Sequence, residues 1–142
     1  MKIRTVDGKD FLPDVDFIRA ANHGGVIRPE AIVLHYTAGG PAPGTVAWFQ
    51  NEAAYVSAHV VVARDGSLTQ MVPLNYKAYH AGISSWEGRE ALNDWAIGIE
   101  IANWGLLNRA LQTWTGRTIP DGQAEYATHK HGMPTGYWEK FT

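Results

Sequence analysis

One histidine, His35, stands where a metal ligand would be useful. It closes the apolar run at residues 31–34 and is followed at once by the small residues Thr-Ala-Gly-Gly. A strand fixes the direction of the side chain at its end, and small loop residues leave room for a substrate. A lone histidine is more commonly a core residue that bonds a neighbouring strand. His35 therefore predicts a metal site only if other residues supply the remaining metal ligands.

A second candidate is the carboxylate of Glu100, which lies inside the apolar sequence AIGIEI at residues 96–101. A carboxylate is costly to bury unless it is paired or hydrogen-bonded. Strand alternation places Gly98 and Glu100 on one face, so the missing side chain at Gly98 predicts open space beside the carboxylate. Partial burial raises the pKa of a glutamate, which suits a general base near neutral pH. The alternative is a glutamate that faces solvent from a one-sided sheet.

Four further histidines carry weaker signals. His59 and His80 could each contact a substrate or serve as a hydrogen-bonded structural residue, and the structural interpretation is favoured for His59. His129 and His131 have an i, i+2 spacing that can chelate a metal, but such a pair is more often solvated. The sequence holds no HExxH, GxSxG or phosphate-loop motif. These residues alone do not identify the reaction that the protein would catalyse.

The elements that must position these residues are mostly strands. Apolar runs without polar alternation predict interior strands at residues 31–37 and 95–103. Further strands are expected near residues 17–19, at 56–64 and at 67–72, the last two joined by an Asp-Gly turn. A helix is expected from an N-cap at Thr45 to about residue 54. Residues 84–92 predict a loop or helical turn, and residues 104–142 a long irregular tail with a helical turn at 106–111. Together these elements predict an α/β domain with a mixed sheet.

Composition excludes several classes of function. The formal net charge of −2 leaves no basic footprint for nucleic acid, and the absence of cysteine excludes disulfides, thiolate metal ligands and a cysteine nucleophile. Six tryptophans and six tyrosines would mostly fill the core, with some left to line a groove. No segment has the apolar length of a membrane span, and the first residues lack the apolar stretch of a signal peptide. We therefore expect no membrane partner and a cytoplasmic location.

Four motifs in order, IVLHYTAG, VSAHVVVARDGSLTQMVP, KAYHAGISSWEGR and LNDWAIGIEIAN, resemble the zinc-dependent N-acetylmuramoyl-L-alanine amidases. That superfamily includes wall-recycling amidases, phage amidase lysozymes and animal peptidoglycan recognition proteins. The resemblance is strong over residues 31–103 and loose as far as 141. It implies a mixed central sheet flanked by helices, with zinc at one edge of the sheet. It also implies hydrolysis of the amide between N-acetylmuramic acid and L-alanine in peptidoglycan or its fragments.

The resemblance assigns roles to individual residues. It implies that His35 is the first zinc ligand and that Glu100 activates the attacking water or protonates the leaving amine. It implies that His80 and Trp86 border the substrate groove and that Asn93 helps to shape it. Phage and animal members have a tyrosine before the next strand histidine, where this chain has Ala58. The Ser-Ala-His pattern is closer to the recycling type, which relies on the glutamate. We also expect His59 to be a substrate-binding residue.

The resemblance also implies that two zinc ligands follow a helix downstream of residue 142. His129 and His131 do not match that ligand motif and receive no role. We therefore expect residues 1–142 to form a single amidase domain that lacks its C-terminal helix and ligand-bearing segment. Since a catalytic zinc normally needs three protein ligands, this chain alone should bind zinc weakly. The alternatives are a non-catalytic module that binds peptidoglycan fragments and an inactive fragment of an amidase. Whether the substrate is intact wall or a cytoplasmic anhydro-muropeptide stays open, and the alternative to a cytoplasmic location is a phage- or prophage-encoded enzyme released to the wall.

Overall fold

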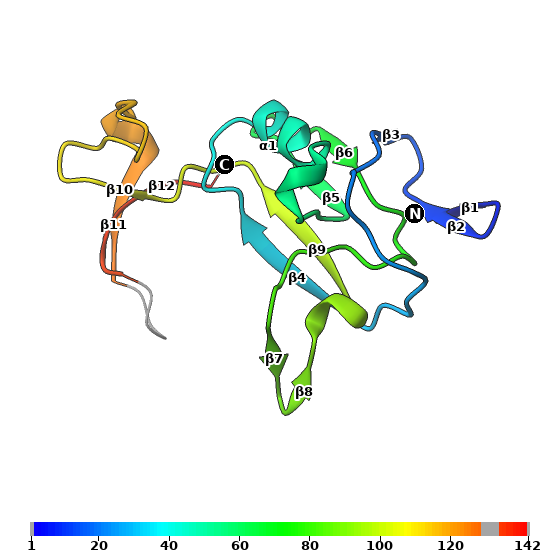
Figure 1. Cartoon of the computed structure of the whole chain (residues 1–142). Helices are drawn as coiled ribbons and strands as arrows, with labels where there is room; N and C mark the ends of the chain where they lie inside the picture. Colours follow the sequence, from blue (N-terminus) through cyan, green and yellow to red (C-terminus); the bar gives the residue numbers. More distant parts are fainter. Residues whose placement is uncertain (1, 129–133, 142) are drawn as a thin grey trace.

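The computed structural model describes residues 2–128 and 134–141 of the chain. The strands of its central sheet are β3 (Asp16–Phe17), β4 (Ala31–Tyr36), β5 (Val60–Val62), β6 (Leu68–Gln70) and β9 (Ala96–Ile101). They lie in the order β3-β6-β5-β9-β4 (Figure 1). The β5–β6 pair is antiparallel, whereas the β3–β6, β5–β9 and β4–β9 pairs are parallel. The predicted mixed sheet of an α/β domain is confirmed.

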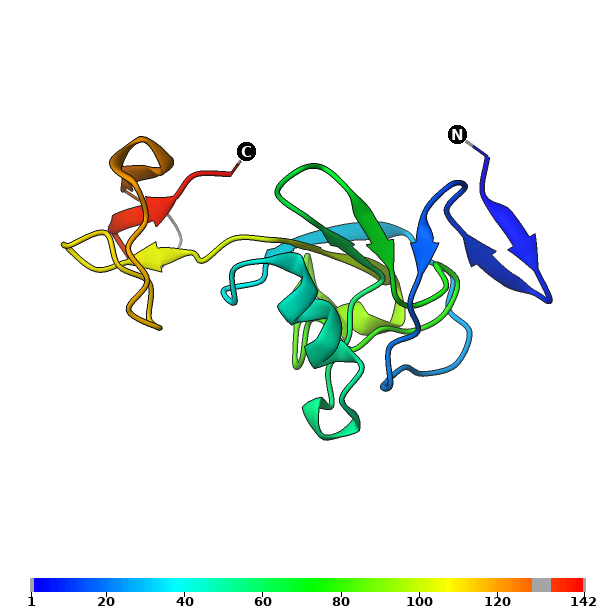
Figure 2. The same cartoon turned by 90° about the horizontal axis from the view of Figure 1, so that it is seen from above.

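One helix, α1 (Ala42–Phe49), covers one face of this sheet (Figure 2). The predicted N-cap at Thr45 is wrong: the N-cap is Pro41, four residues earlier. A second proline, Pro43, lies in the first turn, where its φ is already helical and no intrahelical donor is lost. The chain then leaves the α-helix at Gln50 and makes a separate 3₁₀ turn, η1 (Glu52–Ala54). The core between helix and sheet is apolar and contains Ala20, Phe49, Ala58, Val61, Met71, Val72, Ala78 and Ala102.

Strand β4 differs from its predicted interior position. It forms the edge of the sheet, and Ile32 and Leu34 are 62% and 65% exposed on the face away from α1. The alternate residue His35 faces the side of the helix. The apolar run predicted a strand correctly and its burial wrongly, because a local pattern does not say whether both faces of a strand receive a partner. The predicted interior strand β9 does lie inside the sheet, between β5 and β4.

Two hairpins occur where no strands were predicted. One joins β1 (Arg4–Val6) and β2 (Lys9–Phe11), and the other joins β7 (Ser85–Trp86) and β8 (Arg89–Glu90). Each has a two-residue turn whose second residue is glycine, and both residues of each turn have positive φ. This is the hairpin turn that matches the twist of the strands. The loop or helical turn predicted for residues 84–92 is thus wrong over the hairpin, although a 3₁₀ turn, η2 (Leu92–Asp94), follows it.

The predicted irregular tail is in fact a small lobe. Three short strands, β10 (Leu106–Leu107), β11 (Ala124–Ala127) and β12 (Gly136–Glu139), form an antiparallel sheet in the order β10-β12-β11, with a 3₁₀ turn, η3 (Asp121–Gln123), before β11. The lobe stands beyond the end of β9, on the side far from the N-terminal hairpin (Figure 2). The helical turn expected at residues 106–111 is replaced by β10 and the turn that follows it.

Glu139 attaches this lobe to the central sheet. It is 4% exposed, its Oε2 accepts the N–H of Trp104 at 2.7 Å, and it pairs with Arg64 at 3.3 Å. Asn103 also donates to the carbonyl of Glu139 at 3.1 Å. These buried contacts link residues far apart in the sequence, so no local pattern could have predicted the lobe.

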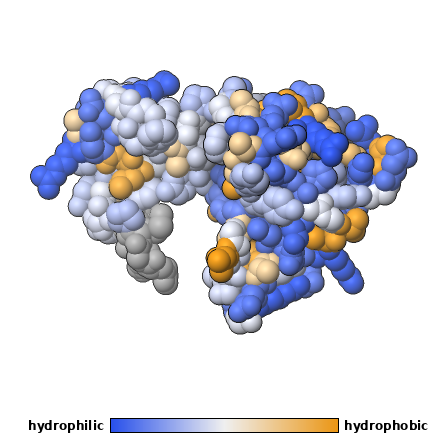
Figure 3. Space-filling view, in the orientation of Figure 1, coloured by the Kyte–Doolittle hydropathy of each residue, from blue (hydrophilic) through white to orange (hydrophobic). Residues whose placement is uncertain are grey.

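The face of the molecule seen in Figure 3 is mainly hydrophilic, with several separate hydrophobic patches. Within the described part of the chain, no helix is long and apolar enough to span a membrane.

Candidate active site

Three imidazole rings form a row beneath α1. His35 comes from the end of β4, His80 from the loop after β6, and His59 from the residue before β5. The ring centroids of His35 and His80 are 5.2 Å apart, and those of His80 and His59 are 5.9 Å apart. The sheet and the loop therefore bring together three of the predicted site residues.

Hydrogen bonds fix the proton positions on His80 and His35. The Nε2 of His80 lies 3.2 Å from the carbonyl oxygen of Ala96, so this nitrogen must donate. The Nδ1 of His80 then accepts from the Nε2 of His35 at 3.0 Å. This order leaves the lone pair of His35 Nδ1 uncommitted among the described residues. Burial is the main cause that lowers the pKa of both rings, which favours these neutral forms.

His59 occupies a different environment from the other two rings. It is fully buried, its Nε2 donates to the carbonyl of Tyr76 at 2.7 Å, and its Nδ1 accepts the N–H of Gly98 at 3.0 Å. Burial lowers its pKa to about 4. With both nitrogens bonded to backbone and no exposed surface, His59 is a structural histidine here. We leave it out of the proposed substrate groove.

Glu100 lies beside His35 on the neighbouring strand, because the two residues pair in the parallel β4–β9 register. Its Oε2 is buried and has no hydrogen-bond partner among the described residues. Burial raises the pKa of Glu100 to about 6. A carboxyl group in this state can take up and release a proton close to neutral pH.

The open space predicted beside Gly98 is filled. A Cβ at this position would overlap the imidazole of His80, so the glycine is needed to let that ring lie against β9. The absence of a side chain at Gly98 thus creates room for a histidine from a distant loop. The sequence predicted the vacancy but could not identify its occupant.

A cavity of about 520 Å³ lies at one end of this group: Glu100 and His80 line it, whereas His35 and His59 are not among its lining residues. Thr37, Ser57 and Tyr79 contribute polar groups to its wall. Its other lining residues are mainly apolar or glycine and include two tryptophans that sequence reasoning did not single out: Gly39, Gly44, Thr45, Trp48, Phe49, Val56 and Trp114. The arrangement combines an apolar wall with a few polar groups and one perturbed carboxyl, as enzyme sites do.

Two predicted groove residues lie outside this lining. The side-chain oxygen of Asn93 accepts the backbone N–H groups of His80 and Ala81 at 3.0 and 2.9 Å. Asn93 therefore holds the loop that carries His80. Trp86 is 63% exposed on the β7–β8 hairpin and does not line the cavity around Glu100.

Comparison with known proteins places this geometry in a family. The family described as N-acetylmuramoyl-L-alanine amidase matches residues 26–131, which hold the whole row of histidines and Glu100. The chain belongs to the N-acetylmuramoyl-L-alanine amidase family. The resemblance inferred from the four motifs is confirmed.

Individual relatives match over shorter stretches. 1,6-Anhydro-N-acetylmuramyl-L-alanine amidase AmpD of Citrobacter freundii is 54% identical over 46 residues, which are 32% of this chain and 25% of that protein. N-acetylmuramoyl-L-alanine amidase AmiD of Escherichia coli (strain K12) is 38% identical over 82 residues, 55% of this chain and 30% of that protein. The chain thus spans about a quarter of the length of the AmpD relatives it matches.

Solved amidase structures share the fold. The crystal structure of a selenomethionine AmpD derivative matches with a TM-score of 0.57 and 30% identity, covering 64% of this chain and 62% of that one. The structure of PlyL matches with a TM-score of 0.51 and 21% identity, covering 61% and 56% of the two chains. The predicted amidase-type α/β fold is therefore confirmed.

The described residues of this amidase-family chain do not form a complete metal site. In residues 2–128 and 134–141, no group of three or more histidine, cysteine, aspartate or glutamate side chains could hold an ion. His35 can offer Nδ1 as a single ligand, which is fewer than the three that a catalytic zinc needs. His129 and His131 lie outside the described residues.

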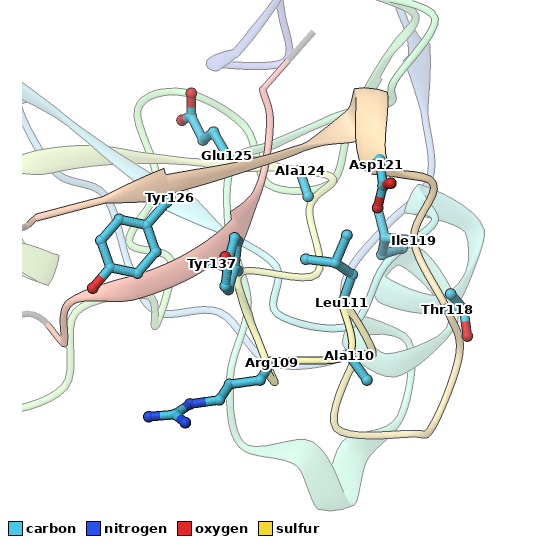
Figure 4. Close-up of a pocket in the computed structure, with 10 residues that line it drawn as sticks. All are labelled: Arg109, Ala110, Leu111, Thr118, Ile119, Asp121, Ala124, Glu125, Tyr126 and Tyr137. Carbon is cyan, nitrogen blue, oxygen red and sulfur yellow. The ribbon is translucent and has the colours of Figure 1, made fainter.

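A second cavity of about 500 Å³ lies in the C-terminal lobe of the amidase-family chain (Figure 4). Tyr126 and Tyr137 meet edge to face at 5.2 Å on one side of it, and Arg109 extends from another. None of the described residues that line it is a histidine, and it shares no lining residue with the cavity around Glu100. Of the predicted site residues, Glu100 and His80 line the first cavity and none lines the second.

Proposed function

We propose that this protein hydrolyses the amide bond between N-acetylmuramic acid and L-alanine in peptidoglycan fragments. One observation supports this most: in a chain of the amidase family, Glu100 lines a cavity that could admit substrate, and its buried Oε2 lacks a hydrogen-bond partner among the described residues. Such a carboxyl needs a ligand or a water molecule to satisfy it.

In the proposed reaction Glu100 carries one proton through both halves of the hydrolysis. Water attacks the carbonyl carbon of the lactyl amide, and the Glu100 carboxylate takes the proton as the new C–O bond forms. Glu100 then gives that proton to the amine nitrogen as the C–N bond breaks. The products are the lactyl carboxylic acid and the free amino group of L-alanine. A carboxyl with a pKa of about 6 is suited to both transfers near neutral pH.

Zinc is part of the proposal as a cofactor, with His35 Nδ1 as one ligand. The hydrogen bond from His35 Nε2 to His80 supports this, because it turns the free lone pair of the ring away from His80. The described residues do not complete the ligand set, so no step of the reaction is assigned to the metal.

Metal analysis of the purified protein tests the role of His35. We expect His35→Ala to remove whatever stoichiometric zinc the protein holds, while His23→Ala, a change in a partly buried loop histidine away from the site, leaves zinc unchanged. Stoichiometric zinc retained by His35→Ala would contradict the assignment.

The AmpD relatives are named for a 1,6-anhydro-N-acetylmuramyl substrate. We extend that substrate class to this protein and place the reaction in the cytoplasm. Cell fractionation followed by detection of the protein tests this location.

Product analysis tests the reaction directly. The protein is incubated with N-acetylmuramyl-L-alanyl-D-isoglutamine in ¹⁸O-labelled water, and the products are identified by mass spectrometry. We expect N-acetylmuramic acid and L-alanyl-D-isoglutamine, with the label in the muramic acid carboxylate. Cleavage at another bond, or no cleavage of either this substrate or its 1,6-anhydro form, would overturn the proposed reaction.

A second candidate is a module that binds peptidoglycan fragments without cleaving them. The incomplete set of metal ligands among the described residues favours it. The same incubation separates the two candidates, because saturable binding of the muramyl peptide with no product in added zinc would support the binding module.

A further inference from the structure

Trp114 is an exposed side chain with a fixed orientation. Its indole is 75% exposed, yet its Nε1–H donates to the carbonyl oxygen of Ala38 at 2.6 Å. Trp104 contacts it edge to face, with ring centroids 6.4 Å apart. Trp104 in turn lies against Gly40, where a Cβ would overlap its ring. An exposed tryptophan held by two independent contacts presents a rigid apolar face to solvent.

The loop that carries Trp114 is also ordered by its own hydrogen bonds. Gln112 and Thr118 form an antiparallel bridge at its base. The backbone N–H of Thr113 donates to the carbonyl of Arg117 at 2.8 Å, and Thr113 Oγ1 accepts the N–H of Arg117 at 3.1 Å. A short, hydrogen-bonded loop of the C-terminal lobe therefore places Trp114 against Ala38, in the segment that follows His35.

Trp114 lines the cavity that contains Glu100, as does Trp48 of α1, which is 52% exposed. Among the described residues that line this cavity, none is a lysine or arginine. Its polar lining residues are four that carry hydroxyl groups, Thr37, Thr45, Ser57 and Tyr79, together with His80 and Glu100. Aromatic faces together with neutral hydroxyls suit a ring that has one apolar C–H face and polar edges. They do not suit the carboxylates of a peptide, which cationic side chains would recognise.

We propose that Trp114 is a specificity-determining residue that stacks on the pyranose ring of the muramyl substrate. This inference rests on the proposed function and names the part of the substrate that the cavity recognises. The C-terminal lobe thereby contributes directly to substrate selection, and the peptide extends away from the aromatic wall.

Titration of a catalytically silent protein tests the inference. On a Glu100→Gln background, muramyl dipeptide is added while the indole ¹H–¹⁵N resonance of Trp114 and the Kd are followed. We expect the ligand to shift this resonance and Trp114→Ala to weaken binding by about tenfold, the size of a lost aromatic contact. Trp114→Phe keeps the aromatic face and should recover part of the affinity.

Two controls separate stacking from other effects. Tyr126→Ala removes an aromatic residue that is 63% exposed in the same lobe and lines the other cavity, so it should leave the Kd unchanged. L-Alanyl-D-isoglutamine, the peptide without its sugar, should not shift the Trp114 resonance. A Kd within twofold of the parent in Trp114→Ala, or an equal shift by the dipeptide alone, would overturn the inference.

The outcome is distinguishable from failure of the proposed function. If the wild-type protein cleaves muramyl dipeptide while Trp114→Ala binds it normally, the stacking role of Trp114 is contradicted and the proposed hydrolysis is not. If muramyl dipeptide is neither bound nor cleaved, the proposed function falls and the stacking role falls with it.

Discussion

At the scale of single residues, the site depends on two side chains that burial affects in opposite ways. Burial raises the pKa of Glu100 to about 6, because the charged form loses its hydration. Burial lowers the pKa of His59 to about 4 for the same reason, since here the charged form is the protonated one. The buried Oε2 of Glu100 has no hydrogen-bond partner among the described residues, whereas both nitrogens of His59 are bonded. The arrangement of Glu100 suits proton transfer, whereas that of His59 stabilises the folded chain.

The state of Glu100 can be measured in metal-free protein. We expect its side-chain carboxyl ¹³C resonance to titrate near pH 6 and not near the ordinary value of 4.5. Because the folded state holds this proton more tightly than the unfolded state, Glu100 lowers stability as pH rises from about 4.5 to 6. Glu100→Gln should therefore be more stable than the parent above pH 6, by on the order of 1 kcal/mol after allowance for solvent screening. A midpoint near 4.5 would contradict the burial described for this carboxyl.

His59 should make the protein sensitive to acid. The unfolded chain takes up a proton at this residue below about pH 6.5, whereas the folded chain resists protonation down to about pH 4. Its contribution to stability is therefore complete above pH 6.5 and is lost as pH falls through that window, by roughly 3 kcal/mol in all. Urea unfolding at several pH values measures this loss. The pH slope should shrink in His59→Asn, and an unchanged slope would mean that other groups cause the acid sensitivity.

At the scale of elements, the central feature is the contact between β9 and the loop that carries His80. Gly98 lets the imidazole lie on the strand, Ala96 accepts its Nε2–H, and Asn93 holds the loop backbone. His35 completes the chain of hydrogen bonds from β4. The position of the candidate metal ligand thus depends on a loop and on two neighbouring strands.

Gly98→Ala tests this dependence. The new methyl group must displace the ring of His80, so we expect a loss of about 1–3 kcal/mol in unfolding free energy and a broken His35–His80 hydrogen bond. Gly44→Ala is the matched control, because nothing lies within 4 Å of a Cβ there and alanine favours the helix interior. Urea unfolding gives the stability, and histidine ¹⁵N shifts report the hydrogen bond. If both variants unfold at the same free energy as the parent, the close packing at Gly98 is wrong.

At the scale of the whole molecule, the sequence predicted what local patterns determine. The apolar run around Glu100 predicted an interior strand, because alternation and length are local properties, and that strand is β9. His35 and Glu100 were separate candidates, and the parallel register places them side by side. The occupant of the space at Gly98 could not be predicted, since His80 comes from a loop 18 positions earlier in the chain.

The C-terminal lobe was missed for a related physical reason. Its strands are two to four residues long, which is too short for alternation to be recognised. Its attachment depends on buried polar contacts of Glu139, and its link to the cavity on the bond from Trp114 to Ala38. These contacts join residues 35 or more positions apart. Only the folded molecule reveals that the lobe adds a wall to the candidate active site.

The most direct test of the proposed amidase is the rate at which Glu100→Gln cleaves muramyl dipeptide, compared with the parent protein under the same zinc concentration. Removing the group that carries the proton should lower the rate by about 10²- to 10⁴-fold. Binding of the substrate and the cooperative unfolding transition should both persist, because glutamine keeps the size of the side chain. A rate near that of the parent would show that Glu100 does not carry the proton, and the central claim would be contradicted.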